Sequence, residues 1–168
     1  MTSREAYIVL NQIEGIGPVR VRALCDALGS PEAVLSASAA HLATVRGIGP
    51  KVAENIVTQR GTLDAAREEE AAAQVGARLV TPLDEEYPAP LKNIYDPPLC
   101  LYVRGTLCAK DEQALAVVGT RQASSYGMSQ AEHLAFQASQ AGFTIVSGLA
   151  RGVDSTAHRA ALKAGRLL

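Results

Sequence analysis

Two apolar runs in the last third of the chain, separated by an alanine-rich segment, constrain the fold most strongly. LAVVG at residues 115–119 is predicted to be a fully buried strand, and FTIVSG at residues 143–148 is predicted to be another. Residues 128–140 between them have the composition of a helix, which Gly142 ends. A strand, a helix and a strand of this length form a βαβ unit with parallel strands. The sequence therefore predicts an α/β fold with a parallel sheet in this region.

The loops that follow the two predicted strands combine glycine, hydroxyl and arginine residues. Their sequences are GTRQASSYG and SGLARGVDSTAH, and parallel strands place both loops at the edge where open α/β sheets bind ligands. Gly119 and Gly148 allow close backbone approach, and Arg121 offers a planar, permanently charged fork. Asp154, preceded by Arg151, is predicted to be a helix N-cap. The hydroxyls that can donate hydrogen bonds are those of Thr120, Ser124, Ser125 and Ser147. The combination predicts a composite phosphate site, with two ordinary capped turns as the alternative.

Neither loop matches a motif of nucleotide chemistry. The phosphate loop of nucleotide hydrolases needs G-x-x-x-x-G-K-[ST], and dinucleotide-binding folds need G-x-G-x-x-G. Ser155 does not lie in a nucleophile elbow, and His158 is interpreted as a packing or helix-orienting residue. A nucleotide- or phosphoribosyl-processing enzyme is the alternative function, and it would depend on Asp154 with His158.

An internal repeat constrains the N-terminal third of the chain. Gly-Ile-Gly-Pro occurs at residues 15–18 and again 32 positions later at residues 47–50, each time followed by apolar residues at helical spacing. The glycines allow a tight turn, and each proline suits the first position of a helix. Each copy is therefore predicted to be a helix, a hairpin and a second helix.

The repeated hairpin resembles the tandem helix-hairpin-helix modules of DNA-repair and recombination proteins. Unpaired backbone N–H groups at a helix start suit a nucleic-acid phosphate without distinguishing bases. The secondary DNA-binding candidates are therefore Gly15, Gly17, Gly47, Gly49 and Lys51. The sequence is equally compatible with a compact helical packing unit, and a protein-interaction module is a further possibility.

The segment between these regions is acidic. Residues 62–112 carry ten Asp or Glu against five Lys or Arg, whereas residues 113–168 carry two against five. The net charge of −1 conceals this distribution, which favours the first and last segments as places for a bound phosphate. An Ala/Glu-rich helix is predicted up to Gly76, followed by strands at 78–81 and 99–103. The acidic runs at 68–70 and 84–86 are interpreted as solvent-facing side chains.

Cysteine usage and hydropathy narrow the class of protein. Cys25, Cys100 and Cys108 are an odd number at unrelated spacings, so neither a disulfide framework nor a metal site is expected. The chain has no apolar run as long as a membrane span and no signal-peptide core. We therefore expect a cytoplasmic protein that binds no membrane, and we expect no cofactor.

Three motifs, in this order and spacing, resemble the DNA-processing protein A (DprA/Smf) family. They are DPPLCLYVRG from Asp96, AVVGTRQASSYG from Ala116 and SGLARGVDSTAHRAAL from Ser147. The resemblance covers essentially the whole chain. It implies a tandem helix-hairpin-helix (SAM-like) domain at residues 1–61 and the N-terminal part of an extended Rossmann-like domain at residues 62–168.

The resemblance also implies a function. Proteins of this family bind single-stranded DNA and load the RecA recombinase onto it during natural transformation, often as homodimers and without catalysis. On the matching positions, the phosphate-contacting candidates are Gly119, Thr120, Arg121, Ser147 and Gly148, supported by Ser124, Tyr126, Arg151 and Gly152. The family continues past AALKAGRLL with another strand and a basic loop. The resemblance therefore implies that this chain is truncated at its C-terminus.

Overall fold

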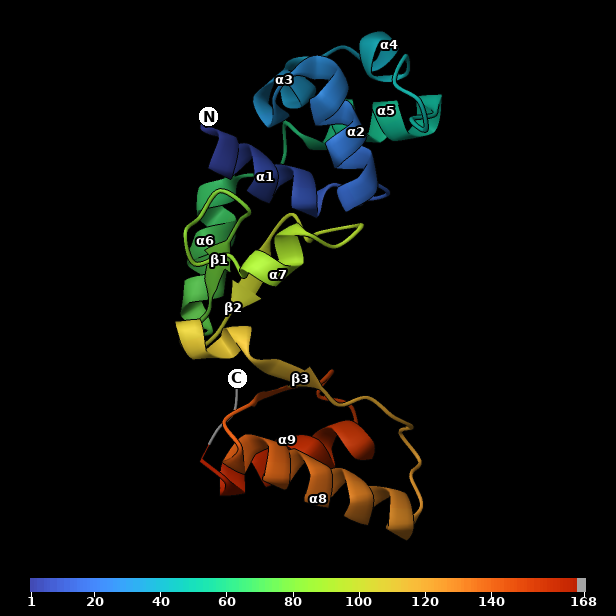
Figure 1. The fold of residues 1–168 in the computed structure, drawn as a ribbon. Helices are drawn as coiled ribbons and strands as arrows, with labels where there is room; N and C mark the ends of the chain where they lie inside the picture. Colours follow the sequence, from blue (N-terminus) through green and yellow to red (C-terminus); the bar gives the residue numbers. More distant parts are fainter. Residues whose placement is uncertain (166–168) are drawn as a thin grey trace. The chain divides into compact units, whose positions relative to one another are not determined.

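The computed structural model describes residues 1–165, which form two compact units (Figure 1). Unit 1 is Met1–Arg104, and unit 2 begins at Gly105. The domain boundary expected after residue 61 lies within unit 1, whose apolar core continues across it, and this boundary stays a prediction. No helix in the described part of the chain is both long enough and apolar enough to cross a membrane.

The first part of unit 1 is helical and contains the repeated hairpins. Its helices are α1 (Ser3–Gln12), α2 (Pro18–Leu28), α3 (Pro31–Ser36), α4 (Ala39–Leu42) and α5 (Pro50–Gln59). Gly17 and Gly49 are the N-caps of α2 and α5, so Pro18 and Pro50 occupy the first helical position, where a missing N–H leaves no acceptor unpaired. The predicted pattern of hairpin and helix is confirmed.

The second part of unit 1 adds a helix and a pair of strands. It consists of α6 (Ala65–Gln74), β1 (Arg78–Val80), α7 (Ala89–Lys92) and β2 (Leu101–Val103). β1 and β2 are antiparallel, with Leu79 opposite Tyr102. The core of unit 1 extends from Ile8 and Leu24 in the helices to Leu79 in β1, so the helical part and the strands share one apolar interior.

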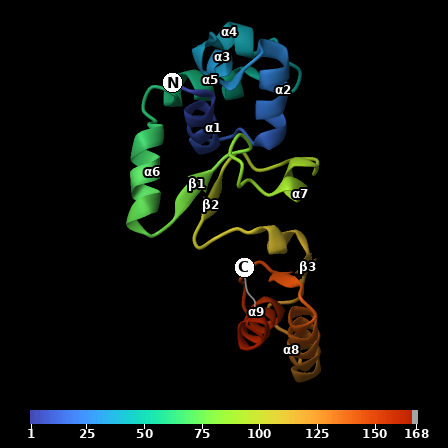
Figure 2. The ribbon, with the colours of Figure 1, turned by 60° about the vertical axis from the view of Figure 1, so that its left-hand side comes forward.

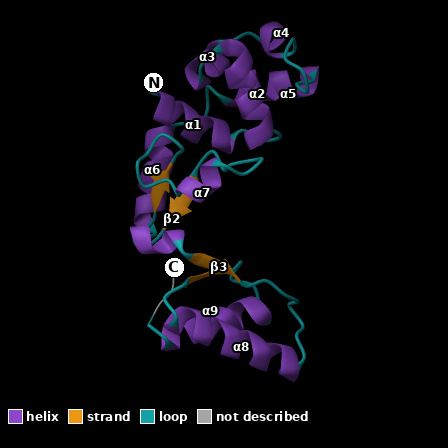
Figure 3. Cartoon of the chain, viewed as in Figure 1, coloured by secondary structure: helices purple, strands orange, loops and turns teal. Residues whose placement is uncertain are grey.

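Unit 2 contains the predicted βαβ arrangement. Its elements are the 3₁₀ helix η1 (Ala109–Glu112), β3 (Ala114–Ala116), α8 (Ser125–Gln140), β4 (Thr144–Val146) and α9 (Val153–Lys163). β3 and β4 are parallel, with Leu115 beside Ile145. α8 and α9 pack against each other and on one side of the strands (Figures 1 and 2). The α/β class and the parallel strands are confirmed, and both strand pairs are short (Figure 3).

The prediction that residues 115–119 form a fully buried strand is wrong in its burial. The strand ends at Ala116, and its three residues are all exposed. Leu115 is 43% exposed and Val118 is 79% exposed. β4 is the only described strand that pairs with β3, so no strand among residues 1–165 is hydrogen-bonded to the other edge of β3. Ile145 in β4 is buried as expected, because α8 and α9 both pack on that strand.

Two helix starts also differ from the prediction. α8 begins at Ser125, with the Ser124 hydroxyl accepting a hydrogen bond from the Gly127 N–H, so Tyr126 lies in a helix and not in the loop. α9 begins at Val153 with Gly152 as its N-cap, whereas Asp154 was predicted to be the cap. Gly152 has a φ of +83°, a conformation that glycine adopts without strain and aspartate does not.

Candidate nucleic-acid interface

The two predicted loops of unit 2 are joined by direct hydrogen bonds. We call residues 117–124 the Thr-Arg loop and residues 147–152 the Ser-Gly loop. The Ser147 hydroxyl donates to the Val117 carbonyl oxygen at 2.6 Å. The Val153 N–H, which follows the Ser-Gly loop, donates to the Thr120 carbonyl oxygen at 3.3 Å. The parallel strands therefore bring the two loops together as expected, and the loops form one surface.

Two glycines make this approach possible. A Cβ on Gly152 would lie well inside van der Waals distance of the Thr120 carbonyl oxygen and 2.8 Å from the Arg121 carbonyl oxygen. A Cβ on Gly119 would lie 2.6 to 2.9 Å from the side-chain carbons of Val153. Any larger residue at either position would push the loops apart. These glycines act through the backbone packing of the surface.

Asp154 holds the Ser-Gly loop from inside the protein. The residue is only 7% exposed, and its Oδ2 accepts a hydrogen bond from the Ala150 N–H at 3.4 Å. A Cβ on Gly148 would lie 3.0 Å from the same oxygen. The carboxylate thus fixes the loop in place of the helix-capping role that the sequence predicted.

His158 supports the same loop from α9. Its Nε2 lies 3.3 Å from the Ser147 carbonyl oxygen, and its Nδ1 is buried with no hydrogen-bond partner among the described residues. Asp154 and His158 therefore both face protein atoms. This geometry is consistent with the interpretation of His158 as a packing residue. In this geometry, neither Asp154 nor His158 is placed as an exposed general base, which the alternative enzyme function would require.

A cavity of about 470 Å³ opens between the loops. It is lined by Arg121 and Gln122 of the Thr-Arg loop and by Gly148, Ala150 and Arg151 of the Ser-Gly loop. Both arginines are exposed, and no residue within 1–165 forms an ion pair or a side-chain hydrogen bond with either guanidinium. Two cations without counter-charge at one cavity favour an anionic ligand.

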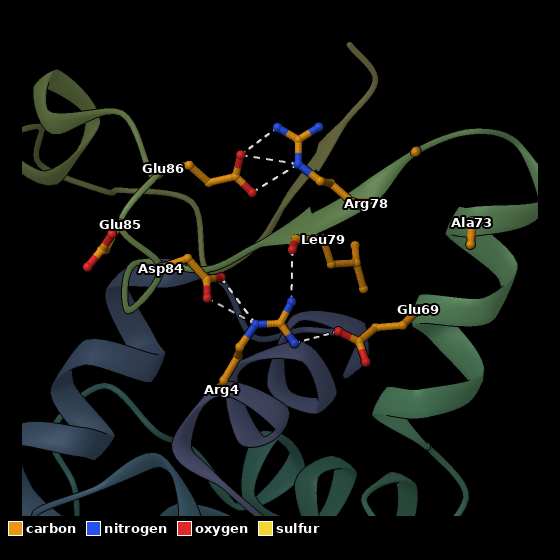
Figure 4. A pocket seen from close by; sticks show the side chains of 9 residues that line it. Arg4, Glu69, Ala73, Arg78, Leu79, Asp84, Glu85 and Glu86 are labelled. Atoms are coloured by element: carbon orange, nitrogen blue, oxygen red, sulfur yellow. Dashed lines mark hydrogen bonds and ion pairs between the residues drawn. The ribbon is translucent and has the colours of Figure 1, made fainter. Parts of the chain in front are cut away.

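A cavity in unit 1 shows the opposite electrostatics. It has a volume of about 540 Å³ and also contains two arginines, Arg4 and Arg78 (Figure 4). Arg4 pairs with Glu69 and with Asp84, and Arg78 pairs with Glu86. The side-chain hydrogen bond with Glu69 raises the pKa of Arg4, and the bond with Arg78 lowers the pKa of Glu86. This cavity is neutralised internally, so the cavity of unit 2 is the better anion site.

The sequence suggested that the acidic runs face solvent, but some of their carboxylates are hydrogen-bonded to other residues of unit 1. Asp84 accepts hydrogen bonds from the Thr81 N–H at 2.7 Å and from Arg4 Nε at 3.1 Å. Burial would raise the pKa of Asp84, but these bonds outweigh burial and hold the pKa below its ordinary value. Burial raises the pKa of the Tyr102 phenol to about 12. The hydrogen bond that the Tyr102 hydroxyl donates to Glu68 contributes to this rise. The described residues contain no cluster of His, Cys, Asp and Glu that could hold a metal ion.

Three of the four predicted hydroxyls, those of Thr120, Ser124 and Ser147, have partners inside the protein. Thr120 Oγ1 accepts from the Gln122 N–H at 3.1 Å, Ser124 caps α8, and Ser147 joins the two loops. These side chains shape the surface, while Arg121, Gly148 and Arg151 line the cavity itself. Tyr126 is exposed at the start of α8.

The sequence did not single out Leu149, Gln122 or Ala150. Leu149 is the one non-glycine residue with a positive φ, +58°, among those described, and it is 81% exposed. Such a backbone conformation costs about 1–3 kcal/mol, and strained residues cluster at ligand-binding sites. An apolar side chain gains nothing from exposure to water, so neither the backbone nor the side chain of Leu149 stabilises the fold. No sequence pattern signals this conformation.

The secondary candidates lie on the hairpins of unit 1. Gly15 and Gly47 have φ values of +84° and +87°, as tight turns require, and Gly17 and Gly49 have no atom within 4 Å of a built Cβ. Lys51 is exposed in the first turn of α5. The first hairpin is also supported from α5, since Gln59 Oε1 accepts from the Glu14 N–H at 3.0 Å.

Comparison with known proteins gives consistent matches. Residues 7–60 match the SAM-like helix-hairpin-helix tandem. The chain is 34% identical over 166 residues to Protein Smf of Synechocystis, covering 96% of this chain and 42% of that protein. It is 43% identical over 82 residues to the DNA processing protein DprA of Bacillus subtilis, covering 48% of this chain and 27% of that protein. The chain thus spans less than half the length of these relatives.

The fold is also that of a solved structure. The X-ray structure of DNA processing protein A from Streptococcus pneumoniae matches 99% of this chain and 56% of its own length, with a TM-score of 0.71 and 27% sequence identity. Residues 78–167, which are more than half of the chain, match the model for DNA recombination-mediator protein A. They contain the strands, both loops and the cavity of unit 2. The chain belongs to the DNA recombination-mediator protein A (DprA/Smf) family.

Proposed function

We propose that this chain binds single-stranded DNA through the Thr-Arg and Ser-Gly loops. The observation that carries the proposal is the cavity between the loops, which Arg121 and Arg151 line without a carboxylate partner among the described residues. A guanidinium forms two parallel hydrogen bonds to a phosphate, so two of them can hold neighbouring phosphates of one strand.

Backbone and apolar groups complete the proposed contact. No residue within 1–165 accepts a hydrogen bond from the N–H of Arg121, Gly148 or Leu149, so these donors are free for phosphate oxygens. Leu149 in the Ser-Gly loop and Tyr126 in the first turn of α8 present exposed apolar surface and can contact bases. Such contacts depend on charge and shape, so the binding is expected to be largely indifferent to base sequence.

The proposal for the whole protein is a recombination mediator that loads RecA onto incoming DNA in natural transformation. Membership of the DNA recombination-mediator family supports it, as do the relatives named DNA processing protein DprA. We further propose a cytoplasmic protein that acts without catalysis and as a homodimer in its full-length form. The hairpin residues Gly15, Gly17, Gly47, Gly49 and Lys51 are proposed as a secondary DNA contact.

The test is the affinity for fluorescein-labelled oligo(dT), measured by anisotropy at several salt concentrations. Arg121→Ala is expected to weaken binding about tenfold and to make the slope of log affinity against log salt shallower by about 0.7, the value for one lost contact to a single strand. Lys110→Ala is the matched control, because it removes the same charge from an exposed residue of η1, which precedes β3. An Arg121→Ala variant with the affinity and salt slope of Lys110→Ala would refute the site.

A further inference from the structure

Tyr95 is the most exposed aromatic side chain among the described residues, and it lies in unit 1, outside the loops of unit 2. It sits in the segment 93–97 that follows α7, directly before the motif DPPLCLYVRG that starts at Asp96, and its side chain is 79% exposed. Neighbouring Ile94 is also exposed. Large apolar side chains of this kind are normally buried, so their position at the tip of a loop needs a physical reason.

The segment is held in place at both ends. The Tyr87 hydroxyl, from a ring that is buried, donates to the Pro98 carbonyl oxygen at 2.8 Å. The Asn93 N–H donates to the Pro90 carbonyl oxygen at 3.3 Å, and Lys92 Nζ lies 5.9 Å from the centre of the Tyr87 ring. The prolines at 97 and 98 remove further backbone freedom. Tyr95 is therefore presented by a stiff loop.

A hydrogen bond from α2 fixes the tip itself. Arg22 Nη1 donates to the Tyr95 carbonyl oxygen at 3.2 Å, which places the segment after α7 beside α2 (Figures 1 and 2). Arg22 lies four residues after Pro18, or about 6 Å along the helix axis from the start of α2. The tyrosine is therefore tied by Arg22 to the helix that begins at the first Gly-Ile-Gly-Pro hairpin.

The first hairpin offers phosphate-binding groups, which an aromatic ring cannot provide. No described residue accepts a hydrogen bond from the N–H of Gly15, Ile16 or Gly17. Arg20 lies over the turn, with Nη1 donating to the Gly15 carbonyl oxygen at 2.6 Å. Free N–H donors and the positive end of α2 attract a phosphate, and Arg22 adds a cation between the hairpin and the ring.

We propose that Tyr95 is a base-stacking contact for single-stranded nucleic acid, next to a phosphate contact at the first hairpin. An aromatic ring on a fixed loop, with an arginine bound to the same loop, is suited to binding single strands irrespective of sequence. This inference rests on the proposed function, since the ligand is the same, but it assigns a separate surface in unit 1. It also gives a base-stacking role to a chain in which aromatic residues are only 4% of the total.

The test compares oligo(dT) with an abasic oligonucleotide of equal length, which keeps the phosphates and lacks the bases. Tyr95→Ala in the full chain is expected to lower the affinity for oligo(dT) about tenfold and to leave the affinity for the abasic strand unchanged. Tyr95→Phe keeps the ring and is expected to bind like the original protein. Arg121→Ala, in contrast, is expected to weaken binding of both oligonucleotides.

A direct optical readout completes the test. The chain has no tryptophan, so Tyr95→Trp introduces a single indole whose emission is expected to be quenched when oligo(dT) stacks on it. Unchanged emission on DNA binding, or a Tyr95→Ala variant with an unaltered preference for oligo(dT), would overturn the inference and leave Tyr95 as a protein-docking residue. If the unsubstituted protein bound neither oligonucleotide, the proposed function itself would fail.

Discussion

The two units differ in what fills their interiors. Unit 1 buries large aliphatic side chains from several helices and from β1, whereas the buried cluster of unit 2 is almost entirely alanine. The first set includes Ile8, Leu10, Leu24, Leu42 and Ile56, and the second is Ala135, Ile145, Ala157, Ala160 and Ala161. Small side chains let α8 and α9 approach closely, but they remove little apolar area from water.

The large apolar residues of unit 2 lie at its surface instead. Val118 and Leu149 are in the two loops, and Tyr126 begins α8, all of them among the most exposed apolar side chains of the protein. Unit 1 also differs in its charges, since its partly exposed arginines Arg4 and Arg78 are matched by carboxylates and the arginines of the unit 2 cavity are not. The Arg4 and Arg78 cluster of unit 1 is thus satisfied by its own carboxylates, whereas the unit 2 cavity presents arginines that a ligand can satisfy.

The largest expected effect is on core stability. Leu24→Ala removes a fully buried side chain from the dense interior of unit 1 and is expected to lower its free energy of unfolding by about 2–5 kcal/mol. Leu115→Ala, at a partly exposed position on β3, is expected to lower that of unit 2 by less than about 1 kcal/mol. Hydrogen exchange measured peptide by peptide separates the two units. Equal losses would mean that β3 is buried in solution.

The second-largest expected effect comes from replacing glycine by alanine at two turns, one in each unit. Gly152→Ala combines a positive φ with a Cβ placed against the backbone of the Thr-Arg loop, so it is expected to destabilise unit 2 by about 1–3 kcal/mol and to weaken oligo(dT) binding. Gly49→Ala, at an open N-cap with a negative φ, is expected to cost unit 1 less than about 1 kcal/mol. Thermal unfolding and anisotropy measure both changes. Tolerance of Gly152→Ala would show that the loops are not tightly joined.

Local patterns were enough to predict most of the architecture. A proline after a glycine sets the start of α2 and of α5, because it supplies a fixed φ and lacks the N–H that a helix start leaves unpaired. The apolar runs predict β3 and β4, and their separation by one helix requires them to be parallel. The proximity of Arg121 and Gly148 follows from that topology, and both line one cavity.

Features that depend on distant partners were missed. The sequence around Asp84 resembles a polar turn, and its partner Arg4 lies 80 positions away at the start of the chain. The Ser147 hydroxyl is a second case, because it donates to the Val117 carbonyl oxygen 30 positions earlier, a bond that the sequence did not indicate. Composition shows that a hydroxyl is present, and only the folded backbone shows what it already binds.

The smallest expected effect is an acid dependence confined to unit 1, and it arises from Asp84. Because the folded protein holds the pKa of Asp84 below its ordinary value, the carboxylate adds stability above the pKa of the unfolded chain. That stability, of the order of 1 kcal/mol, is lost as the pH falls through the lower pKa of the folded state.

Asp84→Asn is therefore expected to destabilise unit 1 at neutral pH and to flatten its acid dependence. Glu85→Gln is the control, since Glu85 is exposed and forms no hydrogen bond or ion pair with any other residue of 1–165 (Figure 4). Urea unfolding of the two variants from pH 7 to pH 3 measures the difference, and identical pH profiles would remove Asp84 from the balanced charge cluster that distinguishes unit 1 from unit 2.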